Sequence, residues 1–424
     1  WRIQFPITET QTHALAARSS TTIMAVAWRP ALPLITILAL IVYEERVSIP
    51  SCKIVLGAVD LSQPATEFVG DPEDLKVMMV ANLLLLGSEA GFVELYFRDY
   101  YMSKFFQKSF EILNPDMLLV LGDVSAKGSE LTRAKWVSVL HQFHGLLGPF
   151  LGLPYHVILG DRDIGQCSSL NVKSVHWVAS NFPGLDSAGC GAFEISNISF
   201  VSLNSVSLLC GINNLRFGVE KVVERESVEL QMEAEDATEP VNEYSEIREI
   251  NHNFGWKANT ISSGSGPVLL LHFPLHKTAD GSCSADSFRK SLKLSRESSN
   301  APDGRGLVGI GPYKLSHTLP PNVTEYIFQA LKPRIVFSAH THGFCDHLHP
   351  DGTHEVTVPA MTWNAGDDPG FVVATFHRNR NAVSVSYCSL ARESHVIVAY
   401  ISFTVMFVLT MLIAKPPLLR CLRR

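Results

Sequence analysis

The sequence has no excess of positive charge. Its 424 residues include 35 Lys and Arg against 41 Asp and Glu, which gives a formal net charge of −6. A protein that binds DNA or RNA needs a basic surface for the phosphates, so this balance excludes a nucleic-acid-binding role. Charged residues of both signs are scarce, at 18%, whereas hydrophobic residues make up 46%. That ratio excludes a disordered chain and indicates a sizeable folded core.

Two apolar runs flank the centre of the sequence. Residues 396–414 are 19 positions without a charge, close to the roughly 20 that a helix needs to cross a bilayer. Residues 24–43 contain Arg29 and then a shorter apolar run, which predicts a signal anchor or N-terminal transmembrane helix, with a cleavable signal peptide as the alternative. The basic tail 415–424 predicts a cytosolic C-terminus and a lumenal central domain. Residues 1–23, which precede the first Met, are interpreted as untranslated or disordered.

The eight cysteines lack any Cys-x-x-Cys spacing, which excludes a zinc ribbon or a thioredoxin-type redox site. Seven of them fall on the predicted lumenal side. Disulfides form in that oxidising compartment, but the spacing does not give their connectivity, and buried free thiols fit the same pattern. Two acceptor sequons, which begin at Asn197 and Asn322, are consistent with lumenal exposure.

Residues 75–387 alternate short apolar runs with longer amphipathic stretches and contain no internal repeat, which predicts one α/β domain. Five of the short runs predict strands, at 76–81, 116–122, 155–160, 267–272 and 334–339. Two amphipathic stretches predict helices, at 93–113 and 130–147. An acidic insertion at 220–265 is interpreted as a solvated segment, because it shows no fixed ligand spacing.

The predicted strands end at polar residues, several of which bind metals in other proteins. Asp123 and Asp161 follow two strands, His272 ends another, and His340 and His342 follow the last one. Because α/β folds place ligands at the carboxyl ends of their strands, we expect these side chains together at one sheet edge. Two carboxylates and three imidazoles form a mixed set that suits Zn, Fe or Mn. Taken alone, a strand-end Asp is more often a turn or cap residue, and a single His is more often a structural residue.

The order of these motifs resembles the calcineurin-like metallophosphoesterases, whose motifs run DxH, GD, GNH[DE], a single His and GHxH. The resemblance covers residues 76–377, and segments such as NPDMLLVLGDV and LKPRIVFSAHTH are similar to the membrane-anchored subgroup that remodels glycosylphosphatidylinositol (GPI) anchors, and to its fungal cell-division-control relative. It implies a four-layer α/β/β/α sandwich with flanking transmembrane helices, in a multi-pass protein of the endoplasmic reticulum or Golgi membrane. It also implies hydrolysis of a phospholipid or GPI-glycan phosphodiester with bound metal ions.

Under this resemblance, Asp123 matches the family's metal-bridging aspartate, and Asp161, His272 and His340 complete the ligands of one ion. Asp161 stands where the family has Asn, which keeps an oxygen donor at that position. Manganese is the expected ion, with iron and zinc as alternatives.

The other ion site departs from the family pattern. Asn82 and Leu84 replace the Asp and His of DxH, which leaves Asp123, His342 and the Asn82 carbonyl as donors. Arg162 replaces the His of GNH[DE], and a guanidinium binds phosphate oxygens but does not donate a proton at neutral pH. We therefore expect one or two bound ions and assign Arg162 as the catalytic residue that stabilises the phosphate charge.

Three functions stay open. The first is a metallophosphoesterase whose rate is limited by the degenerate ion site. The second is a catalytically impaired pseudophosphoesterase that binds a phosphate headgroup or a protein partner. The third is a structural membrane protein with incidental histidines, and metal content separates it from the other two. Four more histidines, none of which ends a strand, are interpreted as surface or rim residues: His276, His347, His349 and His354.

Overall fold

The structure is a computed structural model of the chain, and it describes residues 31–57, 74–210, 214–236, 266–277, 317–377 and 382–414. The chain divides into two compact units, one of Pro50–Leu390 and one that combines the segments Trp1–Ile49 and Ala391–Arg424. The predicted segments 1–23 and 415–424, and the acidic insertion after residue 236, lie outside the described residues. The first part of the acidic segment, up to residue 236, is helical.

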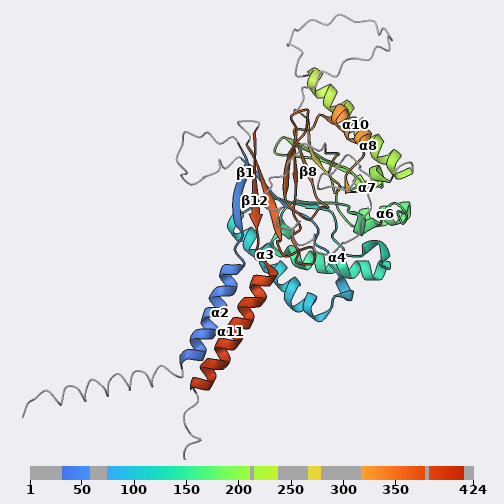
Figure 1. The fold of residues 1–424 in the computed structure, drawn as a ribbon. Coiled ribbons are helices and arrows are strands. Elements are labelled where there is room, and N and C mark those ends of the chain that lie inside the picture. Colours follow the sequence, from blue (N-terminus) through green and yellow to red (C-terminus); the bar gives the residue numbers. More distant parts are fainter. Residues whose placement is uncertain are drawn as a thin grey trace, which may run out of the picture. The chain divides into compact units, whose positions relative to one another are not determined.

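The first sheet of the Pro50–Leu390 unit mixes parallel and antiparallel strands (Figure 1). Its strands, in spatial order, are β1 (Ser51–Leu56), β12 (Ala382–Ser389), β11 (Gly370–His377), β2 (Leu75–Val80), β3 (Met117–Leu121) and β4 (Tyr155–Ile158). β2, β3 and β4 are parallel, and the other pairs are antiparallel. The three parallel strands are buried along nearly their whole length, as their continuous apolar runs predict.

The second sheet has a parallel centre with an antiparallel strand at each edge. Its strands, in spatial order, are β5 (Gly191–Ile195), β6 (Ile198–Ser202), β7 (Val268–Leu270), β8 (Ile335–Ser338), β10 (His354–Thr357) and β9 (Cys345–Leu348). Neighbours from β6 to β10 pair in parallel, whereas β5 and β9 pair antiparallel to the strands beside them. All parallel strands of this sheet therefore point their carboxyl ends to the same edge.

The two sheets pack face to face around one apolar core. Alternate residues of each strand contribute to it, among them Met79 of β2, Leu119 of β3, Phe200 of β6 and Phe337 of β8. Successive side chains of a strand point to opposite faces, so the remaining alternate residues need cover on the outer faces. Helices supply that cover.

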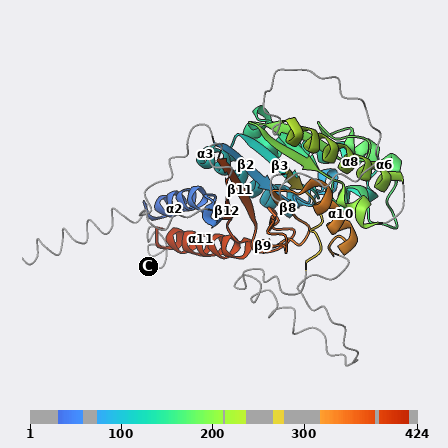
Figure 2. The ribbon, with the colours of Figure 1, turned by 90° about the horizontal axis from the view of Figure 1, so that it is seen from above.

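Helices lie on both outer faces, which gives four layers, α/β/β/α (Figure 2). On the first sheet lie α3 (Asp99–Leu113), which continues a π-helical turn (Glu94–Arg98), and α4 (Arg133–Leu147). On the second sheet lie α7 (Ser205–Leu209), α8 (Asn214–Asp236) and α10 (Pro321–Leu331). Short elements connect these layers: α5 (Asp161–Ile164), α6 (Val172–Ala179) and the 3-10 turns Gly87–Glu89, Gly128–Glu130 and Gly148–Gly152. The predicted mixed α/β fold and the helices predicted at 93–113 and 130–147 are confirmed.

All five predicted strands exist, but the expectation that their ends share one sheet edge is wrong. β2, β3 and β4 belong to the first sheet, whereas β7 and β8 belong to the second. Buried strands of both sheets carry the same continuous apolar runs, so their sequences do not show which sheet each one joins. The polar strand ends meet instead across the gap between two facing sheets.

Two disulfides join described cysteines of the Pro50–Leu390 unit, and Cys345 of this unit is disulfide-bonded as well. Cys52 and Cys388 lie opposite each other on the neighbouring strands β1 and β12, and their sulfurs are bonded. Cys167, after α5, is bonded to Cys210 at the end of α7. Cys190 is a buried free thiol. The described cysteines therefore include both disulfides and a buried free thiol, the two possibilities that the sequence left open.

The described residues of the other unit form two helices, α2 (Leu32–Val47) and α11 (Glu393–Ala414). The rings of Tyr43 and Phe403 pack 5.6 Å apart, and the Tyr400 hydroxyl donates a hydrogen bond to Glu44. Of the helices that the structure describes, one segment, Glu393–Ile413, is long and apolar enough to cross a membrane. The helix within the predicted N-terminal run has 16 residues, and residues 24–30 of that run lie outside the described part of the chain.

Candidate metal centre

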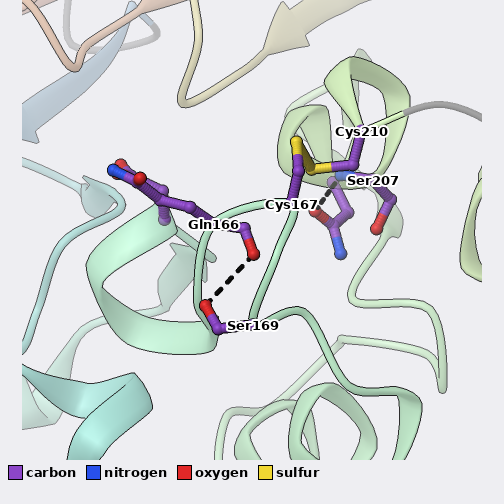
Figure 3. The surroundings of a disulfide bond; sticks show 7 residues. Gln166, Cys167, Ser169, Ser207 and Cys210 are labelled. Atoms are coloured by element: carbon purple, nitrogen blue, oxygen red, sulfur yellow. Dashed lines mark hydrogen bonds between the residues drawn. A yellow bond between two sulfur atoms is a disulfide. The ribbon is translucent and has the colours of Figure 1, made fainter.

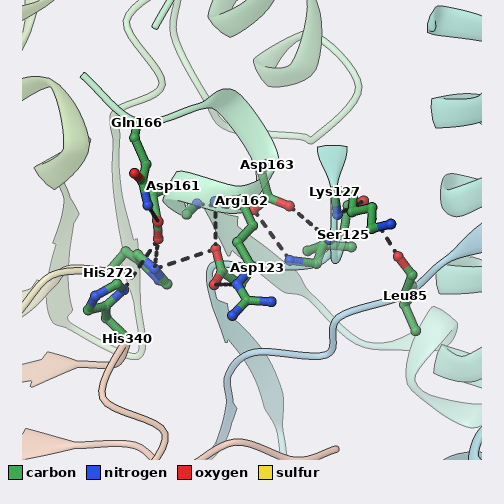
Figure 4. Close-up of polar contacts among 12 residues, drawn as sticks. Leu85, Asp123, Ser125, Lys127, Asp161, Arg162, Asp163, Gln166, His272 and His340 are labelled. Atoms are coloured by element: carbon green, nitrogen blue, oxygen red, sulfur yellow. Dashed lines mark hydrogen bonds and ion pairs between the residues drawn. The ribbon is translucent and has the colours of Figure 1, made fainter. Parts of the chain in front are cut away.

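Residues from both sheets converge at one edge of the sandwich (Figure 4). Asp123 follows β3, Asp161 begins α5 directly after β4, His272 follows β7, and His340 follows β8. The four side chains are largely buried. The carboxyl ends of the parallel strands therefore deliver two carboxylates from one sheet and two imidazoles from the other.

Left-handed backbone conformations mark this edge. Asn82, Leu84, Asp123, His340 and His342 have φ values of 51°, 53°, 54°, 65° and 63°. Residues other than glycine seldom adopt such values, and they occur most often where function requires a particular side-chain direction. The strain is therefore concentrated at the strand ends that carry the candidate ligands.

Two glycines allow the ligand-bearing loops to approach each other. A Cβ atom on Gly122 would lie 2.3 Å from Nδ1 of His272, and one on Gly160 would lie 2.2 Å from Oδ1 of Asp123. Neither gap leaves room for a methyl group. The glycine that precedes each aspartate is therefore required by the packing of the site itself.

Three side chains form a cluster with the spacing of metal ligands. Oδ1 of Asp161 lies 3.1 Å from Nε2 of His272 and 3.3 Å from Nδ1 of His340. One ligand atom from each of the three residues falls within 4.8 Å of the others. Oδ1 of Asp123 lies 3.5 Å from Nε2 of His272, at the side of this cluster.

The hydrogen bonds of His272 show that a cation fits the cluster. Nδ1 lies 2.8 Å from the backbone oxygen of Leu121, which accepts hydrogen bonds only, so Nδ1 carries a proton. In the neutral ring, the lone pair of Nε2 then faces the carboxylate oxygens of Asp161 and Asp123. Such an arrangement needs a proton or a metal ion between the groups, and metal-bound histidines commonly use the other nitrogen in this way. The mixed nitrogen and oxygen donors suit Mn, Fe or Zn.

The charges of the cluster are strongly coupled. Burial disfavours the imidazolium form of His272, but Asp123 and Asp161 outweigh it and raise its pKa to about 9. Burial also opposes ionisation of Asp161, yet hydrogen bonds with His272 and His340 lower its pKa below the usual range. Burial raises the pKa of Asp123. The site thus attracts positive charge, whether from protons or from an ion.

The residues predicted for a second ion site are less well arranged. The Asn82 amide is fully buried, and neither its oxygen nor its nitrogen has a hydrogen-bond partner among the described residues. His342 lies outside the three-residue cluster, and burial, aided by the charge of Arg162, lowers its pKa to about 4. Leu84 is buried, and its backbone NH donates to the Asp123 carbonyl. No cluster of three ligands forms here among the residues that the structure describes.

Arg162 contacts Asp123 through both its backbone and its side chain. Its backbone NH donates to Oδ1 of Asp123 at 3.0 Å, and its guanidinium Nε lies 3.5 Å from Oδ2. The arginine side chain is 43% exposed, so part of the guanidinium also faces solvent. A fixed positive charge therefore occupies the side of Asp123 that faces away from the cluster (Figure 4).

Asp163 supports the site, although the sequence reasoning did not single it out. Its fully buried carboxylate accepts hydrogen bonds from the backbone NH groups of Gly160, Val124 and Ser125. It therefore ties the loop that carries Asp123 to the loop that carries Asp161. The sequence signal was present, because Asp163 is the second acidic residue of Gly-Asp-Arg-Asp.

Asp163→Ala is expected to destabilise the protein by about 3 kcal/mol, because it leaves three buried NH groups without an acceptor. Chemical denaturation would measure the loss of unfolding free energy. Asp116→Ala is the matched control, since Asp116 also accepts a backbone NH, from Lys76, but at the exposed surface. Equal losses in the two variants would show that Asp163 does not hold the loops together.

His317 is a second residue that the sequence reasoning missed. Its Nδ1 lies 2.8 Å from Nε2 of His340, and the two ring centroids are 5.1 Å apart. When Nδ1 of His340 is the unprotonated ligand atom, Nε2 carries the proton and donates it to His317. The pair thus fixes the orientation of the His340 ring. His317 follows no predicted strand and belongs to no motif, so the sequence contained no signal for it.

His317→Leu is expected to weaken binding of a divalent ion by about 10- to 100-fold, the usual effect of losing such a partner. His317→Asn keeps a hydrogen-bonding group near the position of Nδ1 and should restore most of the affinity. Isothermal titration with Mn²⁺ would measure both, with His141→Leu on α4 as an exposed-histidine control. Unchanged affinity in His317→Leu would contradict this role.

The chain is similar in sequence to proteins named Metallophosphoesterase 1 from several vertebrates. No family model matches the chain. It is 25% identical over 342 residues to Metallophosphoesterase 1 of Rattus norvegicus, with 77% of this chain and 74% of that protein covered. The Danio rerio protein of the same name is 25% identical over 354 residues, with 83% and 84% covered. These relatives confirm the resemblance that the order of the motifs predicts.

Two solved structures show a distant likeness. A dimetal phosphatase from Danio rerio is 12% identical, with 74% of this chain and 99% of that chain covered and a TM-score of 0.42. The purple acid phosphatase PPD1 from yellow lupin (Lupinus luteus) seeds is 12% identical, with 77% and 55% covered and a TM-score of 0.38.

Proposed function

We propose, from the premise that this chain belongs to the calcineurin-like metallophosphoesterases, that it hydrolyses a phosphodiester with one divalent ion. The observation that carries the proposal is the convergence of Asp161, His272 and His340 on one point beside Asp123. An ion held there would polarise a phosphate P–O bond and lower the pKa of a bound water toward about 7. Manganese is the proposed ion, with iron and zinc as alternatives, because the donors mix nitrogen and oxygen.

Arg162 supplies the second positive charge of the proposed site. Its guanidinium lies beside Oδ2 of Asp123, next to the position where DxH ligands would hold another ion. A guanidinium binds two phosphate oxygens at once through its planar array of donors. In this proposal Arg162 orients the phosphate and stabilises the negative charge that develops on it. Asn82 and Leu84 supply neither a carboxylate nor an imidazole for a second ion.

Metal analysis and turnover together test this function. The purified full-length chain is expected to contain about one divalent ion and to hydrolyse bis(p-nitrophenyl) phosphate with added Mn²⁺. Arg162→Ala should keep the ion and lose most of the turnover, since the described contacts of Arg162 with the site are to Asp123, which lies beside the cluster. A protein that binds no ion would contradict the proposal, as would an Arg162→Ala variant with unchanged turnover.

A pseudophosphoesterase that binds a phosphate headgroup is the second candidate. The observation that favours it is the replacement of the family's proton-donating histidine by Arg162, which binds phosphate but does not protonate a leaving group. The same protein would then bind one ion and inorganic phosphate without hydrolysing any diester. Saturable phosphate binding with no turnover under all metal conditions would decide for this candidate.

We propose a GPI-glycan or phospholipid phosphodiester as the substrate and the lumenal side of the endoplasmic reticulum or Golgi membrane as the location. The apolar helix segment Glu393–Ile413, the disulfides and the exposed sequon residues Asn197 and Asn322 support this location. Protease protection in intact microsomes tests it, together with a glycosidase-sensitive shift in mass. Degradation of the Pro50–Leu390 unit in sealed vesicles would exclude a lumenal domain.

A further inference from the structure

We infer that the cavity beside the three-residue cluster binds the organic group of the phosphate ester, and that this group is neutral and largely apolar. The cavity has a volume of about 580 Å³. This size suits an organic group larger than a bare phosphate, because small-molecule sites usually span about 300–1,000 Å³. The inference rests on the proposed function, because it assumes that the phosphate itself lies at the cluster.

The cavity is continuous with the three-residue cluster. Asp161 and His340 form part of its wall, and Phe273 packs against His340 with ring centroids 4.1 Å apart. A phosphate at the cluster would therefore direct one ester oxygen into the cavity. The other described residues of the wall are Gln166, Cys167, Ser168, Val206, Leu209, Cys210 and His317.

The cavity walls are held by covalent and hydrogen bonds. The Cys167–Cys210 disulfide joins the loop after α5 to the end of α7, and both segments line the cavity (Figure 3). Gln166, beside this disulfide, donates a hydrogen bond to Oδ2 of Asp161 at 3.2 Å. At the start of α7, Ser205 accepts hydrogen bonds from the backbone NH groups of His272 and Phe273. The cavity and the cluster are thus preformed as one unit.

The charge of the lining indicates the class of ligand. Asp161 is the one acidic side chain among the described residues that line the cavity, and its carboxylate already faces His272 and His340. A cationic group such as an ethanolamine therefore finds no separate counter-charge among the lining residues that the structure describes. Apolar atoms of Val206, Leu209, Phe273 and the disulfide favour an apolar body, whereas Gln166 and Ser168 offer hydrogen bonds to a hydroxyl or carbonyl.

Competition among three phosphate compounds tests the inference. The full-length chain in detergent, loaded with Mn²⁺, is titrated with inorganic phosphate, phosphoethanolamine and phenyl phosphate. Phenyl phosphate is expected to bind at least about tenfold more tightly than the other two, which corresponds to burial of only part of one ring. Equal affinities for phenyl phosphate and phosphoethanolamine would overturn the inference while leaving the proposed function intact.

Leu209→Trp tests the position of the organic group. Leu209 is partly buried in the cavity wall, so an indole at this position should fill the cavity and remove the preference for phenyl phosphate. Metal content and affinity for inorganic phosphate should not change. Leu151→Trp is the matched control, because Leu151 is 51% exposed away from the cavity lining.

The failures can be told apart. A Leu209→Trp variant that keeps the preference for phenyl phosphate overturns the assignment of this cavity. Loss of metal from the same variant would overturn the assignment of Leu209 to the cavity wall alone, because filling the cavity should leave Asp161, His272 and His340 in place. If the native protein binds neither inorganic phosphate nor an ester, the proposed function fails, and the inference fails with it.

Discussion

Replacing His272 with Ala is expected to reduce divalent-ion binding by more than about 100-fold, the upper end of what loss of a supporting partner costs. His272 is fully buried, and its Nε2 faces the carboxylates of both Asp161 and Asp123. We therefore expect no water molecule to replace the imidazole nitrogen as a ligand. His342→Ala should lower the affinity only slightly, because His342 lies outside the cluster. Elemental analysis and Mn²⁺ titration would measure the difference.

His156→Ala is the matched control for this experiment. His156 is also a buried histidine, and its Nε2 shares a hydrogen bond with Ser202 at 2.8 Å, but it lies outside the cluster. The His156→Ala variant should be less stable than the native protein but should keep the bound ion. Equal loss of metal in His272→Ala and His342→Ala would mean that two ions bind as one interdependent pair, contrary to the arrangement described above.

Rebuilding the second ion site is the other change for which we expect a large effect. The triple variant Asn82→Asp, Leu84→His and Arg162→His restores the family's DxH and GNH[DE] side chains. The bound metal is expected to rise from one ion to two, and phosphodiester turnover by about 100-fold or more, which is the lower end of what a positioned acid or base contributes. Equilibrium dialysis and the rate with bis(p-nitrophenyl) phosphate would measure both.

The double variant Asn82→Asp with Leu84→His is the informative intermediate. It keeps the Arg162 guanidinium beside Oδ2 of Asp123, where it should repel a second ion. We therefore expect the double variant to bind the second ion much more weakly than the triple variant. A native protein that already contains two ions, or that already turns over as fast as the triple variant, would contradict the role given to Asn82, Leu84 and Arg162.

The sequence predicted the strands and the polar residues that follow them, because both signals are local. A buried apolar run and the residue at its end require no knowledge of distant segments. The partition of those strands between two sheets was not predictable, since it depends on which strands pair across long separations. For the same reason the motif order indicated that Asp161, His272 and His340 belong together but could not show that the imidazoles face Asp161 from the opposite sheet.

Other parts of the site depend on tertiary contacts alone. The interpretation of His347 and His349 as surface or rim residues is wrong, because both are buried. His349 shares a hydrogen bond with Glu355, and the Phe328 ring of α10 packs against it. His317 reaches His340 from a segment without any periodic pattern. In these cases a helix or loop far away in the sequence determines the environment, so no local pattern could reveal it.

The pairing of β1 with β12 has a consequence for synthesis of the chain. β1 emerges from the ribosome early, yet its partner strand and the bonded cysteine lie 336 residues later. During translation β1 must therefore remain an unpaired edge, exposed to chaperones or to other chains, until almost the entire unit has been made. Formation of the Cys52–Cys388 bond would thus report that translation and folding of the whole unit are complete. Chains truncated before Cys388 would keep a free thiol at Cys52.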